Sequence, residues 1–370
     1  MRADLKGRLI IQNGSDMHVH LRDEAILAAV ASLTARQFGQ ALVMPNLTPP
    51  IVTAEHAIAY RERIRAVLPP ALASFIPRMT IYLTDDTSPD DVRRAFRKDN
   101  VTGERAAEAV KLYPAHATTN SAHGVTDIKK TYRTLATMEE IGMPLCLHGE
   151  TPFHSLQRVP QMDRERVFIE ITLLPLLQKF PKLKVVLEHV STKEGANLVL
   201  CDKSGRLGAS VTPQHLLYSF TDMCEGGFRP HLICMPILKD EVHRDAIREA
   251  VSSGSKYFWA GTDSAPHVAG KKHSHCCPFG VFSASLAVEA YLEAFDQMEA
   301  LGDNCLENFL SFNGPAFFGL PPSPGEIILE RKAWAVEEPI RVTGAGDIWP
   351  FLYEPDPEKR QKLSWQIVVE

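Results

Sequence analysis

Short apolar segments alternate with amphipathic segments along most of this 370-residue chain, and this alternation constrains the fold more than any other feature. The apolar segments have the length of strands, and the segments between them have helical spacing of apolar residues. We predict strands over residues 16–20, 40–46, 78–84, 107–114, 143–149, 184–190, 208–215 and 256–263. We predict helices over residues 24–38, 53–68, 89–99, 127–141, 164–180, 191–200 and 240–252, and from about residue 281 onward.

Eight strands separated mostly by helices are typical of an α/β fold of the (β/α)8 TIM-barrel type. The connections are long enough for right-handed crossovers, and no low-complexity linker divides the chain. We therefore expect a single barrel domain over residues 1–370, with a core at about 8–320. A long loop is predicted over 218–238, and an irregular, Pro-rich tail at about 321–370.

Composition excludes several classes of protein. Apolar residues make up 45% of the chain, enough for a large buried core, and the net charge is -5. Without a long basic run, this charge argues against nucleic acid or an anionic membrane as a partner. The sequence has neither an apolar stretch long enough to span a bilayer nor a signal-peptide pattern. Its seven scattered cysteines favour reduced thiols, so we expect a cytoplasmic globular protein.

Polar residues stand at the ends of six predicted strands, where barrels of this type carry their chemistry. His18 and His20 alternate with apolar residues, so both imidazoles point to one face of a strand and can converge on a metal ion. Because buried polar groups need partners, so many polar strand ends indicate a shared ligand rather than packing. The residues are His18, His20, Asn46, Lys111, His148, His189 and Asp263.

Four histidines and an aspartate exceed the three protein ligands of a usual catalytic zinc, so two metal ions fit this set better. An ammonium beside two dications is strongly disfavoured, so Lys111 must be neutral, excluded from the site or chemically converted. A neutral lysine amine can add carbon dioxide and become a carbamate able to bridge metals. Two such ions can share a hydroxide that is nucleophilic near neutral pH. Asp263 would bind one ion and relay the proton during hydrolysis of an amide-type bond. Alternatively, Asp263 only caps the turn at residues 262–264.

The chain resembles the dihydroorotases of the amidohydrolase superfamily, in particular the shorter, stand-alone type of bacteria and fungi. The resemblance runs from Asp16 to about Phe282 and rests on an ordered set of motifs. These are DMHVHLRD (16–23), VMPNLTPP (43–50), VKLYPAHATTNSAHGV (110–125), LCLHGE (145–150), LEHVST (187–192), TPQHL (212–216), ICMPILK (233–239) and GTDSAPH (261–267).

The resemblance implies two zinc ions per chain, one bound by His18, His20 and Asp263 and the other by His148 and His189. N6-carboxylated Lys111 and a hydroxide would bridge them. It also implies that Arg22, Asn46 and His267 hold the substrate carboxylate, that the backbone near Leu232 reads the pyrimidine ring, and that Thr118 and Thr119 lie in a closing loop. The reaction implied is the reversible cyclisation of the small molecule N-carbamoyl-L-aspartate to L-dihydroorotate plus water, in pyrimidine synthesis, by a homodimer.

Some features depart from this pattern or remain open. His116 stands in the loop segment, residues 95–106 are long and charged, and residues 273–279 differ from the usual run. An extra zinc site at His273, His275, Cys276 and Cys277 is disfavoured by its tight spacing. His215 could face the site or hydrogen bond structurally, Cys146 suits packing, and Glu150 could orient a histidine. The alternative functions are another binuclear cyclic-amide hydrolase, such as a hydantoinase or allantoinase, and a non-catalytic barrel partner.

Overall fold

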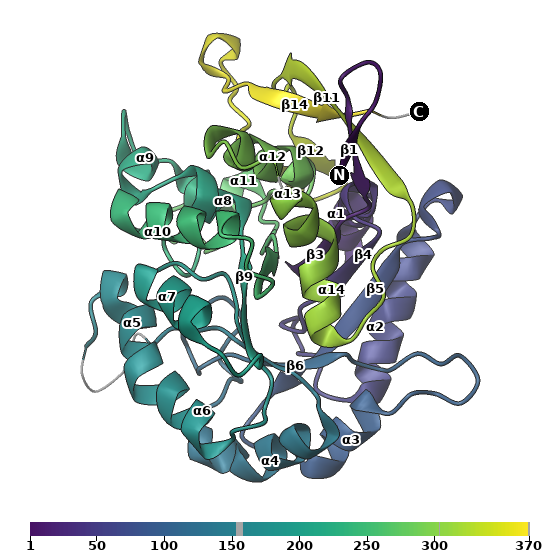
Figure 1. The fold of residues 1–370 in the computed structure, drawn as a ribbon, viewed down its shortest axis with the longest axis vertical. Helices are drawn as coiled ribbons and strands as arrows, with labels where there is room; N and C mark the ends of the chain where they lie inside the picture. The colour runs from purple at the N-terminus through teal and green to yellow at the C-terminus, as the bar shows by residue number, and fades with distance from the viewer. Residues whose placement is uncertain (153–157, 303, 369–370) are drawn as a thin grey trace.

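Eight parallel strands form the centre of the computed structural model, which describes residues 1–152, 158–302 and 304–368 (Figure 1). The strands pair in chain order, and a parallel bridge between Val19 and Ser264 joins the last strand region to the first. The (β/α)8 barrel is thereby confirmed. Its strands are β3 (Ser15–Val19), β4 (Gln40–Val43), β5 (Ile76–Leu83), β6 (Ala109–Leu112), β7 (Leu145–Leu147), β8 (Val185–Leu187), β9 (Leu207–Val211) and β10 (Phe258–Ala260).

Helices surround the barrel, and several begin at the capping residues that the sequence contains. Thr53 accepts a hydrogen bond from the N–H of His56, and Ser88 forms a capping box with Asp91 ahead of Pro89. The helices are α1 (Glu24–Gln37), α2 (Ala54–Val67), α3 (Pro89–Phe96), α4 (Tyr132–Ile141), α5 (Arg164–Phe168), α6 (Leu174–Lys179), α7 (Lys193–Cys201), α8 (Pro213–Leu217), α9 (Phe220–Cys224), α10 (Glu241–Ser252), α11 (Ala269–Lys272), α12 (Ala287–Gln297), α13 (Cys305–Glu307) and α14 (Asn313–Phe318).

Alternating side chains divide each barrel strand between two layers of the core. Inward-facing residues fill the barrel, where Cys146 packs with Met17, Val186 and Trp259. Outward-facing residues of the same strands pack beneath the helices. In register, Lys111 lies opposite Tyr82 on β5 and Cys146 on β7, so its side chain also points into the barrel. The expectation that Cys146 is a small packing residue is confirmed.

The C-terminal tail is not irregular, and this expectation is wrong. Strands β11 (Glu326–Trp334) and β14 (Leu363–Ile367) join β1 (Arg2–Ala3) and β2 (Leu9–Gln12) in an antiparallel sheet of order β1-β2-β11-β14. Figure 1 shows this sheet at one end of the molecule, where the two ends of the chain come together. A smaller hairpin pairs β12 (Ile340–Val342) with β13 (Gly346–Ile348). The sequence did not indicate these strands, because prolines surround them and because the partner strand β2 lies more than 300 residues away.

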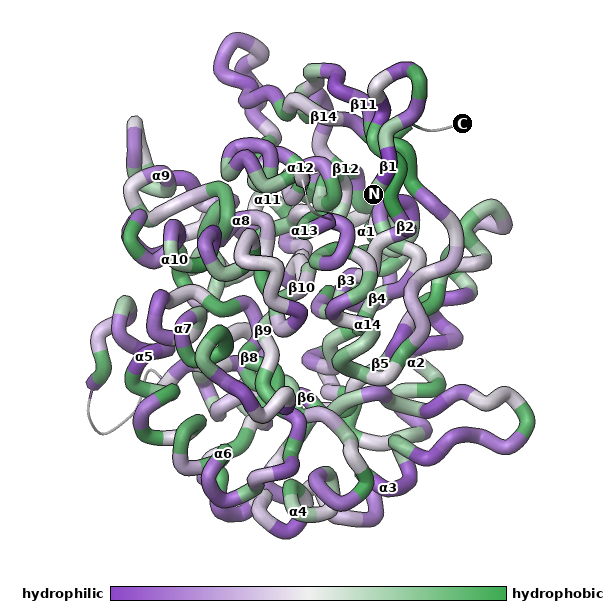
Figure 2. The backbone as a smooth tube through the Cα atoms, in the orientation of Figure 1, coloured by the Kyte–Doolittle hydropathy of each residue, from purple (hydrophilic) through white to green (hydrophobic). Residues whose placement is uncertain are grey.

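Three smaller expectations also need correction. The strand expected over 208–215 ends at Val211, and α8 takes up the remainder. The loop expected over 218–238 contains α9. The helix expected over 89–99 ends at Phe96. The charged residues after it form a projecting hydrophilic loop beside α3 (Figure 2). An antiparallel bridge between Lys98 and Arg105 joins the two sides of this loop. Among the described helices, none is both long and apolar enough to cross a bilayer.

Candidate metal and substrate site

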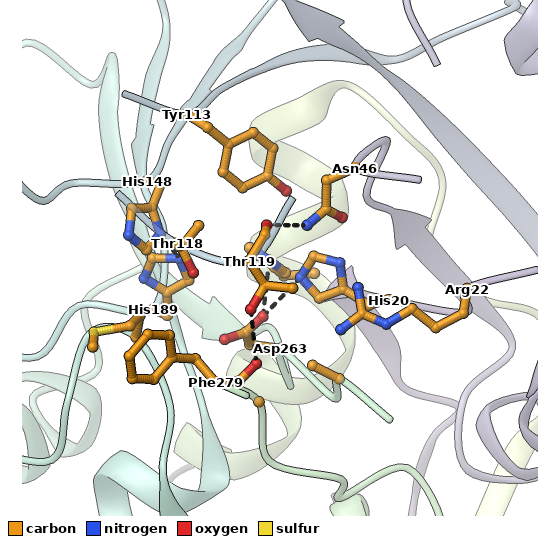
Figure 3. Close-up of a pocket in the computed structure, with 14 residues that line it drawn as sticks. His20, Arg22, Asn46, Tyr113, Thr118, Thr119, His148, His189, Asp263 and Phe279 are labelled. Carbon is orange, nitrogen blue, oxygen red and sulfur yellow. Dashed lines mark hydrogen bonds and ion pairs between the residues drawn. The ribbon is translucent and has the colours of Figure 1, made fainter. Parts of the chain in front are cut away.

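Three predicted metal ligands meet where β3 ends and the chain leaves β10. The Oδ1 atom of Asp263 lies 3.3 Å from the Nε2 of His18 and 3.0 Å from the Nε2 of His20. Ligand atoms from the three buried residues all lie within 4.8 Å of one another. Figure 3 shows Asp263 and His20 joined at the floor of the pocket. This set matches the ligand types and closeness that a zinc-like ion requires.

A carboxylate behind His18 fixes the orientation of its imidazole ring. Glu188 lies 2.8 Å from the Nδ1 of His18 and also accepts a hydrogen bond from Ser210. Burial alone would raise the pKa of Glu188, but attraction to His18 and Lys111 holds this pKa below its usual value. The ionised carboxylate holds the Nδ1 side of the His18 ring, so the Nε2 atom of His18 faces Asp263. This Nε2 atom has no hydrogen-bond partner among the described residues, and a cation between it and the Asp263 carboxylate would stabilise the contact.

The remaining two histidines form a second pair. The Nδ1 of His148 and the Nε2 of His189 face each other at 3.2 Å, which is close to the separation of two nitrogen ligands about 2.0–2.1 Å from one tetrahedral ion. Burial lowers the pKa of both imidazoles, which keeps them neutral and able to bind a metal. Glu150 lies 3.2 Å from the other nitrogen of His148, in the orienting position expected for it.

Lys111 lies between these two groups and is 0% exposed. Its Nζ atom has no hydrogen-bond partner among the described residues, and burial lowers its pKa. The Nζ atom lies 5.2 Å from the centroid of the Tyr113 ring. An unpartnered buried amine near the imidazoles of His18, His148 and His189 is costly as an ammonium, so the surroundings favour its neutral form.

We call these six residues (His18, His20, Lys111, His148, His189 and Asp263) the metal side of the pocket. Two of them adopt left-handed backbone conformations, with φ of 43° at His189 and 46° at Asp263. Such angles are uncommon for residues other than glycine and gather at functional sites. They turn the chain sharply just after β8 and β10, so that both side chains point into the barrel mouth.

A second part of the site is polar and cationic, and we call it the carboxylate side (Arg22, Asn46, His267 and the lid residues 118–121). Arg22, Asn46, Thr118 and Thr119 line the pocket, and His267 contacts Arg22. Arg22 Nη2 lies 3.3 Å from the Nε2 of His267, and Arg22 Nη1 has no hydrogen-bond partner among the described residues. The hydroxyl of Tyr60 donates to the Arg22 carbonyl at 2.5 Å, which fixes the backbone here. Burial and the Arg22 charge lower the pKa of His267 to about 2, so this imidazole is neutral.

The lid is hydrogen bonded across the pocket. Asn46 donates from Nδ2 to the Thr119 carbonyl at 3.3 Å, and Asn120 donates to the Asn46 carbonyl at 3.0 Å. The Thr119 hydroxyl donates to the Phe279 carbonyl at 3.2 Å. Figure 3 shows Thr119 joined in this way to both Asn46 and Phe279. His116 precedes the lid in a left-handed turn, and its N–H donates to Ser121 O at 3.1 Å.

Comparison with known proteins gives a consistent result. Residues 10–336 match the amidohydrolase family. A dihydroorotase of Erwinia tasmaniensis is 46% identical over 369 residues, covering 99% of this chain and 100% of the relative. The mitochondrial dihydroorotase of Oryza sativa is 46% identical over 93% of this chain and 82% of that protein. The chain belongs to the dihydroorotases of the amidohydrolase family.

Solved structures agree with this assignment. Dihydroorotase from Saccharomyces cerevisiae, in complex with 5-fluoroorotic acid, superposes with a TM-score of 0.86 at 29% identity, covering 98% of each chain. Dihydroorotase from Campylobacter jejuni gives a TM-score of 0.84 at 32% identity, covering 99% of this chain and 98% of the other. An L-hydantoinase from Arthrobacter aurescens shares the fold, with a TM-score of 0.76 at 14% identity, covering 97% of this chain and 83% of the other.

The side chains present fit the binuclear metal site that is typical of this family. The fit rests on two observations among the described residues: the His18 Nε2 atom faces the Asp263 carboxylate at 3.3 Å without a hydrogen-bond partner, and the buried Lys111 amine has no partner either. Four imidazoles, one of them in contact with the Glu188 carboxylate, gather in the barrel mouth together with one further carboxylate and one amine. An apolar core would not tolerate so many polar atoms without a shared cation.

In this dihydroorotase the Leu232 side chain is buried in the hydrophobic core and, like Lys111 and His267, is not among the residues that line the pocket, so the contact of its backbone with the pyrimidine ring stays a prediction. Three residues further along, Met235 lines the pocket. Sequence reasoning also missed the lining residues Tyr113, Ala265, Phe279 and Gly280. The sequence signal for Tyr113 was its place beside Lys111 at the end of β6, whereas the loop residues gave no such signal.

His215 and His273 take structural roles. His215 lies in α8, where its Nε2 is 3.1 Å from the Pro236 carbonyl and its Nδ1 is 2.8 Å from the Thr212 hydroxyl, so the hydrogen-bonding interpretation fits. His273 pairs with His231 at 2.9 Å between Nε2 atoms, beside Trp349. Within the described ranges, the groups of three or more metal-binding side chains comprise only His18, His20 and Asp263, so an extra zinc cluster at 273–277 gains no support.

Proposed function

We propose that this chain catalyses the reversible cyclisation of N-carbamoyl-L-aspartate to L-dihydroorotate and water. The observation that supports this reaction most is the juxtaposition of the two sides of the pocket. The Oδ1 atom of Asp263 lies 3.0 Å from the Nε2 of His20, and Arg22, whose Nη1 donor has no partner among the described residues, lines the same pocket. A metal-binding group beside a carboxylate-binding group suits a cyclic amide that carries a carboxylate.

We infer that two zinc ions bind the metal side, one held by His18, His20 and Asp263 and the other by His148 and His189, with N6-carboxylated Lys111 between them. When bound, the ions would supply a hydroxide that is nucleophilic near neutral pH and would polarise the reacting carbonyl. Lys111 suits carboxylation because burial lowers the pKa of its amine, which favours the neutral, nucleophilic form. The carbamate would give it the partners that its Nζ lacks.

Asp263 carries the proton in this proposal. During ring opening its carboxylate accepts the proton of the attacking nucleophile and then donates it to the leaving ring nitrogen. During ring closure it acts in the reverse order. The hydrogen bonds from His18 and His20 overcome the effect of burial and hold the pKa of Asp263 well below its usual range, so the carboxylate begins the cycle as a base.

The carboxylate side binds and orients the substrate. A guanidinium presents a planar pair of donors to a carboxylate, and the Nη1 of Arg22 is available for this role. Asn46 and His267 add neutral hydrogen-bonding groups beside it. The lid residues Thr118 and Thr119 line the same pocket and exclude water when they lie over the ring.

The proposed function is tested with a pair of substrates that differ in the carboxylate. Ring opening of L-dihydroorotate and of dihydrouracil, which lacks that group, is followed by the loss of ultraviolet absorbance. We expect kcat/KM for dihydroorotate to exceed that for dihydrouracil by at least about 100-fold. Dihydrouracil has no carboxylate, so it would leave the buried charge of Arg22 without a partner, which is costly. Equal rates would favour a hydantoinase-type hydrolase, and no turnover of either by metal-loaded protein would favour a non-catalytic barrel.

Two further properties are part of the proposal. We propose a cytoplasmic location, consistent with seven unpaired cysteines among the described residues. We also propose a homodimer, on the resemblance to stand-alone dihydroorotases. Light scattering coupled to gel filtration tests the dimer, and a mass of 41.1 kDa would contradict it.

A further inference from the structure

A buried lysine outside the metal side organises the loop that carries the Phe279 carbonyl. Lys272 ends α11 and is only 2% exposed. Its Nζ atom donates to three backbone carbonyls, those of Ile233 at 3.2 Å, Pro278 at 2.9 Å and Gly280 at 2.9 Å. An ammonium has three donors, so each is used. Nothing in the proposed chemistry requires a cation at this position.

The three carbonyls belong to the two segments that border the pocket on this side. Pro278 and Gly280 flank Phe279, and Ile233 lies two residues before the lining residue Met235. The Ile233 carbonyl also accepts the Gly280 N–H at 2.9 Å, so one ammonium and one peptide group tie the segments together. Gly280 has a φ of 149°, and a Cβ there would lie 2.9 Å from the His267 ring, so this loop is packed tightly against His267.

The carbonyl between those held by Lys272 is shared by the lid and the carboxylate side. Phe279 O accepts the Thr119 hydroxyl at 3.2 Å and lies 3.0 Å from the Nε2 of His267. The direction of one peptide group therefore sets both a contact of the His267 ring and the docking point of the lid (Figure 3).

We propose that Lys272 is a positioning residue for substrate affinity and lid closure. By fixing the carbonyls on either side of Phe279, it directs the Phe279 carbonyl into the pocket, where that carbonyl orients His267 and receives Thr119. Lys272 acts through these groups and does not touch the substrate. The statement about substrate affinity rests on the proposed function, whereas the statement about the lid does not.

The test compares Lys272→Met with Lys271→Met in metal-loaded protein. Lys271 is the exposed neighbour in the same short helix and makes a matched control. We expect Lys272→Met to raise KM for dihydroorotate about tenfold, with kcat within about twofold, because three carbonyls lose a charged donor while the metal side is untouched. Zinc per chain should not change. An unaltered KM in folded Lys272→Met would overturn the affinity role.

Amide hydrogen exchange tests the lid without reference to turnover. Exchange at residues 118–121 should be faster in Lys272→Met than in Lys271→Met, because the lid loses its docking point. Equal exchange would overturn the lid role even if the enzyme were active. Wild-type protein that exchanges slowly at the lid but turns over no dihydroorotate would instead contradict the proposed function alone.

A double-mutant cycle separates this role from general stabilisation. If Lys272 acts on the lid through Phe279 O, then Thr119→Val, which removes the hydroxyl that binds this carbonyl, should add less to KM in the Lys272→Met background than in wild type. Additive effects would show that Lys272 does not act through this contact. Should Lys272→Met fail to fold, Lys272→Arg replaces it, because a planar guanidinium cannot meet the same three carbonyls. A KM raised about threefold is then expected, and an unchanged KM would overturn the proposal.

Discussion

The metal side of the pocket is positioned by strands, whereas the carboxylate side is positioned by loops that hold one another. Lys111 is fixed by the register of β6 between β5 and β7, and His18 by β3. Arg22, Asn46 and Thr119 depend instead on hydrogen bonds between segments, such as that from Asn46 to the Thr119 carbonyl. A sheet resists displacement more than a loop does. Changes on the metal side should therefore remove chemistry, while changes on the carboxylate side should mainly weaken binding.

Asp263→Asn should have the largest effect. The amide keeps the shape of the side chain but cannot accept the proton, so we expect kcat to fall about 1,000-fold or more, with KM little changed. The measurement is steady-state ring opening at matched zinc content, with Asp86→Asn at an exposed site as the control. Comparable rates for Asp263→Asn and wild type would exclude the proton relay.

Lys111→Met should come next. Methionine fills the barrel but cannot become a carbamate, so we expect fewer than two zinc ions per chain and at least about 100-fold lower activity. Metal analysis and a ¹³C carbamate resonance in protein prepared with labelled carbon dioxide check this. The exposed Lys129→Met is the control. Two retained zinc ions in Lys111→Met would mean that Lys111 does not bridge them.

Arg22→Met moves the comparison to the carboxylate side. Loss of a charged donor pair should lower kcat/KM for dihydroorotate about 50-fold, mostly through KM, and should leave the zinc content at the wild-type value. The same change should leave any slow turnover of dihydrouracil as it was, since that ring has no carboxylate. A drop in kcat alone would contradict the assignment of binding to the carboxylate side and of chemistry to the metal side.

Thr119→Val should have a smaller effect on turnover. It removes one hydroxyl hydrogen bond to the Phe279 carbonyl, so we expect KM to rise about fivefold. Thr102→Val, in the projecting loop after α3, is the control. If Thr119→Val instead abolished turnover, the hydroxyl would have a role in the chemistry itself.

A buried carboxyl far from the pocket should affect stability but not turnover. Burial raises the pKa of Glu289 from 4.5 to about 7, so the folded protein holds a proton there that the unfolded chain releases. Its contribution is full below pH 4.5 and is lost as pH rises to about 7. Glu289→Gln should therefore lessen the decline in the free energy of unfolding over this range, without changing kcat or KM. Denaturant melts of both proteins across the range test it, and parallel pH profiles would contradict it.

The same contrast explains how far the sequence could predict the molecule. The metal side was predictable because a histidine or lysine at the end of an apolar strand must point into the barrel mouth. Glu188 escaped notice although it directly precedes His189, since only the fold shows that it reaches His18. On the carboxylate side, a peptide carbonyl such as that of Phe279 has no signature in the sequence, and neither has the place of Met235 in the pocket lining.

The antiparallel sheet that joins the two ends of the chain has a consequence for synthesis on the ribosome. Strand β2 (Leu9–Gln12) is synthesised more than 300 residues before its partner β11, which begins at Glu326. During translation the edge of β2 that pairs with β11 therefore stays unpaired until those residues have been made. A nascent chain with an unpaired strand edge is prone to aggregation. Slow translation of residues 326–367 should thus lower the yield of folded protein more than equal slowing within the barrel.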